Sequence, residues 1–127
     1  MKNNIDYYEH EVYSHEHWKF SALRKKYGWE GEGKFWTLNN MIGQAEGCVL
    51  DLSLKSKLFE IASKLDFEPE QFTEYLQFLV KKCQLLTQVD GEKVDDSLFT
   101  TKRVQDAFCK VDAKRSRQRK RQKRRRL

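Results

Sequence analysis

WKFSALRKKYGWEGEGKFWTLNNMIGQA, residues 18–45, is the stretch that decides the fold. Its spacing predicts two helices joined at YGWEGEG, because apolar residues recur every three or four positions on each side of that segment. The first helix contains Phe20, Leu23 and Tyr27, and the second contains Leu38, Met41, Ile42 and Ala45. Gly28 suits the position just after the first helix, where a positive φ costs glycine little. We expect this helical hairpin to nucleate the core.

The glycines of the joining segment, Gly28, Gly31 and Gly33, are interpreted as a tight interhelical turn that allows close packing. A nucleotide-binding glycine loop would instead follow a strand and open a helix. Here a helix precedes the glycines, so the pattern argues against nucleotide binding.

One domain with a single core is expected from 127 residues, of which 39% are hydrophobic. No run approaches the roughly 18 apolar residues that cross a membrane. The start, MKNNIDYYEHEVYS, also has no apolar block of signal-peptide type, so a soluble cytoplasmic protein is expected. The three cysteines, Cys48, Cys83 and Cys109, are odd in number and far apart, which favours buried reduced thiols over a disulfide framework.

The net charge of +6 hides an asymmetry between the body of the chain and its end. Residues 114–127 contain ten lysines and arginines and no acid, whereas residues 1–113 contain 15 basic and 19 acidic residues. The composition of the end cannot bury a core. We therefore divide the chain into a domain at 1–112 and a basic tail at 113–127, which is disordered or helical only when bound.

Two more helices are predicted after a short strand at 49–52. The helix at 54–65 has Ser53 as its expected N-cap, and the helix at 69–83 has Pro69 at its first position. The apolar stripe of the first of these helices consists of Leu54, Leu58, Ile61, Ala62 and Leu65. The stripe of the second consists of Phe72, Tyr75, Leu76, Leu79, Val80 and Cys83.

Strand periodicity begins at 85–89, and Asp90-Gly91 is a strong turn signal. The return strand lies either at 93–95 through a tight turn or at 97–100 through a longer loop. We favour 97–100, because Leu98 to Thr101 are apolar or β-branched. A last helix begins near Lys102, and its apolar face consists of Val104, Ala107, Phe108 and Val111.

This order predicts a mainly α fold with a small β-wing. It is the order of a winged helix-turn-helix, with an added helix at 17–27 and a C-terminal helix that runs into the basic tail.

The wording of residues 6–42 adds a family resemblance. The motifs are YYEH at 7–10, LRKKYG at 23–28, EGEG at 30–33 and FW at 35–36. With them the chain resembles the N-terminal domain of phage and prophage replisome-organiser proteins, the DnaD-like replication-initiation group. The resemblance extends over 1–112 in the order of the predicted elements and over 7–36 in the sequence motifs. It implies a winged-helix fold and a role in DNA replication or DNA binding on mobile elements.

No catalytic set emerges, so we do not expect an enzyme or a cofactor. No serine has the flanking glycines of a nucleophile elbow, and no cysteine has an apparent histidine partner. His10, His15 and His17 lie near one another in sequence, but HEH supplies only a pair of ligands, so no metal site is predicted.

The residues expected to bind nucleic acid lie late in the chain. In a winged helix the helix before the wing enters the major groove. Here that helix is nearly neutral, with Glu70 and Glu74 against Lys81 and Lys82. We therefore expect the tail to supply most phosphate contacts. The predicted nucleic-acid-binding residues are Lys81, Lys82, Lys102, Arg103, Lys114, Arg115, Arg117, Arg119, Lys120, Arg121, Lys123, Arg124, Arg125 and Arg126.

Three hypotheses remain open at this point. The first is a DNA-binding winged-helix protein of phage or prophage type, nucleoid-associated, that binds duplex DNA during replication initiation or its regulation. The second is an adaptor of replication or transcription whose acidic body docks a protein partner. The third is RNA binding through the tail.

Overall fold

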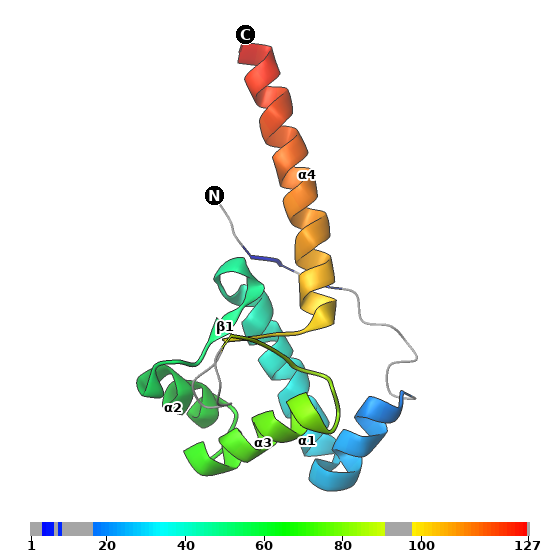
Figure 1. Cartoon of the computed structure of the whole chain (residues 1–127), viewed down its shortest axis with the longest axis vertical. Coiled ribbons are helices and arrows are strands. Elements are labelled where there is room, and N and C mark those ends of the chain that lie inside the picture. The colour runs from blue at the N-terminus through cyan, green and yellow to red at the C-terminus, as the bar shows by residue number, and fades with distance from the viewer. Residues whose placement is uncertain (1–3, 7, 9–16, 91–97, 127) are drawn as a thin grey trace.

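The computed structural model describes residues 4–6, 8, 17–90 and 98–126. This part of the chain is mainly helical, with four α-helices and a small three-stranded antiparallel sheet. In Figure 1 a body of helices and strands lies below a long C-terminal helix that rises out of it. The elements in order are α1 (Trp18–Gln44), the short 3-10 helix η2 (Glu46–Cys48), β1 (Leu50–Asp51), α2 (Lys55–Lys64), α3 (Pro69–Lys81), β2 (Thr87–Asp90), β3 (Leu98–Thr100) and α4 (Lys102–Arg126).

α1 is the predicted helical hairpin, with its turn confined to one residue. Gly28 has φ 73° and ψ −172°, a conformation essentially restricted to glycine, and helix continues on both sides of it. The two arms pack together, since the ring of Phe20 lies 5.6 Å from that of Phe35 and 5.3 Å from that of Trp36. The expectation that the whole YGWEGEG segment forms the joint is therefore wrong, because EGEG already belongs to the second arm.

Gly31 and Gly33 differ in what surrounds them. A Cβ added at Gly31 would lie 2.2 Å from the Cβ of Tyr27, and the Gly31 carbonyl accepts a 2.5 Å hydrogen bond from the Tyr75 hydroxyl. Gly31 thus allows the close approach that the sequence predicted. Gly33 lies within the helical second arm of α1, and a Cβ there would meet open space, so the interpretation of Gly33 as part of a closely packed turn is wrong.

α2 begins without its predicted cap. The backbone N–H and the hydroxyl of Ser53 both donate to Asp51 Oδ1, at 2.9 and 2.6 Å, and Leu54 occupies the N-cap position. The predicted Ser53 cap is wrong because the Asp51 carboxylate, two residues earlier, engages that side chain. These hydrogen bonds also lower the pKa of Asp51. Leu54 is 67% exposed and does not belong to the buried stripe.

α3 begins at the residue that the sequence predicted. Pro69 is its first residue, and the Gln71 side chain accepts a hydrogen bond from the Glu68 N–H at 3.3 Å. The helix ends at Lys81, two residues before the predicted end. Its fully buried side chains are Phe72, Tyr75, Leu76 and Leu79.

The sheet has the order β1-β3-β2, and both pairings are antiparallel. Phe99 on the central strand pairs with Leu50 on one side and with Gln88 on the other. The preferred return strand is confirmed by β3. Residues 91–97, which contain the alternative at 93–95, lie outside the described residues.

The core joins both arms of α1 to α2, α3, the sheet and the first turns of α4. Cys48 and Cys83 are buried with free thiols, as expected, but Cys109 is exposed. Burial of Cys109 was predicted wrongly because this residue lies on the side of α4 away from buried Val104. Within the described ranges, no helix combines the length and apolar character needed to cross a bilayer.

Candidate nucleic-acid interface

α4 is one continuous helix of 25 residues, and at 1.5 Å per residue it is about 37 Å long. Its first turns pack on the body through Val104, which is fully buried, and through partly buried Ala107, Phe108 and Val111. The helix then continues without a break through the predicted division at residue 113. We call residues 114–126 the basic half of α4.

Polar contacts fix the start of α4 on the body. The Thr101 hydroxyl accepts from the Val104 N–H at 3.3 Å and donates to the buried Asn39 side chain at 2.5 Å. Gln105 Nε2 donates to the Cys48 carbonyl at 2.9 Å and to the Thr100 hydroxyl at 2.9 Å. Because these bonds reach α1, η2 and β3, they set the direction in which α4 leaves the body.

Arg103 and Arg115, which were predicted to bind nucleic acid, contact the body of the protein. The guanidinium carbon of Arg103 lies 5.0 Å from the centre of the Trp36 ring, a cation–π contact. Arg115 Nη1 donates to the Asn4 carbonyl at 3.0 Å. We therefore assign both arginines to holding α4 against the body.

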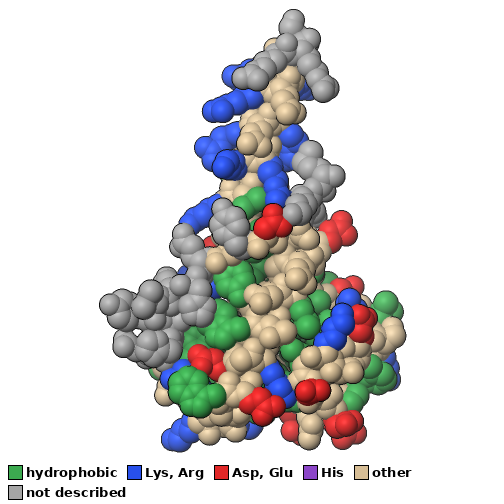
Figure 2. Space-filling model, turned by 180° about the vertical axis from the view of Figure 1, so that it is seen from behind, with side chains coloured by type: hydrophobic (Ala, Val, Ile, Leu, Met, Phe, Trp, Pro, Cys, Tyr) green, Lys and Arg blue, Asp and Glu red, His purple; other side chains and the backbone are tan. Residues whose placement is uncertain are grey.

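The other described cations of the basic half are exposed. They are Lys114, Arg117, Arg119, Lys120, Arg121, Lys123 and Arg124. In Figure 2 blue side chains surround the projecting part of α4, whereas red ones gather lower down, on the body. The side chains of Arg125 and Arg126, in the last turn of α4, lie outside the described part of the chain.

Two electrostatic effects act in opposite directions on the stability of the basic half. Cations near a helix C-terminus interact favourably with the helix dipole. Like charges four residues apart, such as Arg117 and Arg121, destabilise the helix, and no acid lies between residues 114 and 126. Bound phosphates would relieve this repulsion and leave the favourable term in place.

The remaining predicted cations lie apart from the basic half. Lys102 is exposed at the start of α4, and Lys81 and Lys82 are exposed at the end of α3. α3 crosses the lower part of the body in Figure 1, far from the free end of α4. The predicted residues thus do not form one surface, because they are divided among the basic half, the start of α4 and the end of α3.

Two lysines that sequence reasoning missed lie beside the end of α3. Lys26 Nζ lies 4.6 Å from the centre of the Phe78 ring, and Lys19 Nζ donates to the Gln84 carbonyl at 3.3 Å. Both come from the first arm of α1. They could not be found by pattern, because only the packing of the hairpin brings them to α3.

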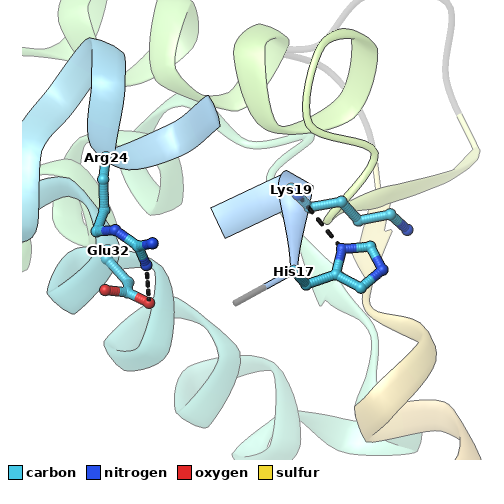
Figure 3. A network of polar contacts seen from close by, with 4 residues as sticks. All are labelled: His17, Lys19, Arg24 and Glu32. Atoms are coloured by element: carbon cyan, nitrogen blue, oxygen red, sulfur yellow. Dashed lines mark hydrogen bonds and ion pairs between the residues drawn. The ribbon is translucent and has the colours of Figure 1, made fainter. Parts of the chain in front are cut away.

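Figure 3 shows two polar contacts of α1, one between its two arms and one at its start. Arg24 Nη1 lies 3.3 Å from Glu32 Oε1, an ion pair that bridges the two arms of α1, and Arg24 also covers the Trp29 ring at 4.7 Å. His17 Nδ1 accepts from the Lys19 N–H at 3.3 Å and so caps α1. No cluster of three potential metal ligands occurs among the described residues, and His10 and His15 lie outside them.

Comparison of the chain with protein-family models, with curated proteins and with solved structures gives no match in any of the three.

Proposed function

We propose that this protein binds duplex DNA, with the basic half of α4 supplying most of the affinity. The observation that carries the proposal is a continuous helix with seven exposed cations, projecting from a body whose remaining charge is negative. The major groove of B-DNA is about 12 Å wide and admits an α-helix. Lysine and arginine bound to phosphates release counterions, which favours binding at low salt.

We further propose that the body is a winged helix. The support is the element order α1-β1-α2-α3-β2-β3 together with the sheet order β1-β3-β2. In such a fold α3 would face the major groove. Its exposed residues are Glu70, Gln71, Glu74, Gln77 and Lys81. With two carboxylates and one ammonium on that face, α3 adds little phosphate affinity, so the basic half becomes the main anchor.

A role in replication initiation of phage or prophage type is part of the proposal. It is supported by the resemblance of residues 7–36 to replisome-organiser proteins.

A protein-docking role is the second candidate, because the body exposes large apolar side chains. Trp29 is 72% exposed, Leu54 67% and Phe59 50%. Exposed apolar groups beside polar ones are typical of interaction sites when they form a patch. A replication or transcription protein that docks here would bind without nucleic acid.

The test is a competition experiment on the full chain. A labelled DNA duplex is bound at low salt and displaced with unlabelled duplex, single-stranded DNA or structured RNA of equal length. Duplex DNA as the strongest competitor supports the proposal, and RNA as the strongest competitor replaces it with RNA binding. Absence of all three interactions, combined with capture of one protein from nuclease-treated lysate, would favour the adaptor.

A further inference from the structure

The side of α4 that faces the body fixes the rotational phase of the whole helix. Val104, Phe108, Val111 and Arg115 all contact the body or are partly buried against it. Their spacing of four, three and four residues follows one side of an α-helix. Continued in the same alternation, three and then four, this side reaches Gln118 and Gln122, which are both exposed.

Cations flank these two glutamines on both sides. At 100° per residue, Lys114 and Arg121 lie roughly 60–80° to one side of the glutamine pair, and Arg119 lies about 80° to the other. Lys120 and Arg124 lie on the opposite side of the helix. The basic half has three uncharged residues, Ser116, Gln118 and Gln122. Both glutamines lie on the side that continues the body-facing side of α4.

The chemistry of the pair differs from that of its surroundings. Lysine and arginine can only donate hydrogen bonds, whereas a glutamine amide both donates and accepts. In the major groove adenine presents the N7 acceptor beside the N6 amino donor, and one glutamine can bind both atoms. The flanking cations are then placed to contact the phosphates of the two strands.

We propose that Gln118 and Gln122 are a base-reading pair for adenine in the major groove of duplex DNA. This inference rests on the proposed function and deepens it from phosphate affinity to sequence preference. Residues four apart on a helix are separated by about 6 Å along its axis. Base pairs follow one another every 3.4 Å or so. The two glutamines therefore reach adenines about two base-pair steps apart.

The test measures binding of the full chain to three duplexes of equal length by fluorescence anisotropy. The first has an A·T-rich centre, the second contains only G·C pairs, and the third is the first with 7-deazaadenine, which lacks the N7 acceptor. We expect the first to bind roughly five- to tenfold more tightly than the second, the lower end of what a bidentate contact provides. The third should lose most of that advantage, which separates base contact from a preference for A-tract shape.

Two double variants complete the design. Gln118→Ala with Gln122→Ala should abolish the preference and the 7-deazaadenine effect while keeping the salt dependence. The matched control is Lys120→Ala with Arg124→Ala, which adds the same two alanines on the opposite side of the helix. It should weaken binding to all three duplexes by one factor and keep the preference.

Equal affinity for A·T-rich and G·C duplexes, with the salt dependence intact, overturns the base-reading pair and leaves the proposed function standing. A preference that survives the glutamine variant, or that persists with 7-deazaadenine, overturns it as well. Failure to bind any duplex overturns both.

Discussion

The guanidinium of Arg115 donates a hydrogen bond to the backbone carbonyl of Asn4 at 3.0 Å, across 111 residues of sequence. This bond ties the second half of α4 to the N-terminal segment. Arg115 therefore helps to position the basic half, although in the sequence it is one of ten similar cations.

Replacing Arg115 should affect stability, whereas replacing an exposed arginine of the same helix should not. Arg115→Gln removes a charge-assisted bond to a partly buried carbonyl, and we expect a loss of about 1 kcal/mol in the free energy of unfolding. Arg121→Gln, on an exposed position, is the matched control and should not lower the urea midpoint. Equal midpoints for both variants would contradict a positioning role for the Arg115–Asn4 contact.

The helicity of the basic half should depend on salt. Screening weakens repulsion between like charges at i and i+4, so the far-ultraviolet helical signal should rise from low to physiological salt and rise again on adding duplex DNA. Arg121→Glu places an acid four residues after Arg117 and replaces a repulsive pair with an attractive one. This variant should start with more helix and respond less to salt, and an identical salt response would contradict the explanation.

Two glycines of α1 should respond in opposite directions to alanine. Gly28→Ala forces a side chain into φ +73°, and we expect a loss of about 1–3 kcal/mol in stability. Gly33→Ala adds a methyl group in open space within a helix, where alanine gains about 0.5–1 kcal/mol over glycine. Urea unfolding of both variants measures the difference, and the same sign for both would refute the one-residue turn.

The three thiols should alkylate in a fixed order. Cys109 is exposed, whereas burial raises the pKa of Cys83 to about 11 and also raises the pKa of Cys48. In the folded protein at about pH 8 a short alkylation pulse should modify Cys109 alone, because the thiolate is the nucleophile. Raising the pH toward 9 should still leave Cys83 unmodified, because its pKa of about 11 keeps it largely in the thiol form. Peptide mass spectrometry reads the sites, and in urea all three should react.

Much of the fold could be predicted because helical periodicity is local. The stripes at Phe72, Tyr75 and Leu76 and at Leu58 and Ile61 become the buried faces of α3 and α2. The predictions were wrong where local interactions or backbone geometry differed from what the pattern indicated. The Asp51 carboxylate engages the side chain expected to cap α2, and the joint at Gly28 needs one residue, not seven.

The candidate site was predictable as a charge cluster but not as a geometry. Counting identified the ten cations, but the same composition suits a disordered chain and a helix. Whether Arg103 contacts DNA or Trp36 depends on tertiary packing, and the same is true of Lys26 beside Phe78. The sequence shows that Gln118 and Gln122 are uncharged, but the phase of α4 is needed to place both on the side that continues its body-facing side.

The most direct test of the account is the salt dependence of duplex binding by the full chain and two triple variants. Arg117, Arg121 and Arg124 are changed to glutamine in one, and exposed Lys25, Lys55 and Lys110 in the other. If about six phosphates are engaged, the slope of log Kobs against log salt should be near −5 for the unchanged chain, at roughly −0.9 per phosphate. The arginine variant should fall to a slope of about −2 to −3, and the lysine variant should keep the original slope. Equal slopes for the two variants, or no salt dependence in the unchanged chain, would contradict the assignment of duplex binding to the basic half of α4.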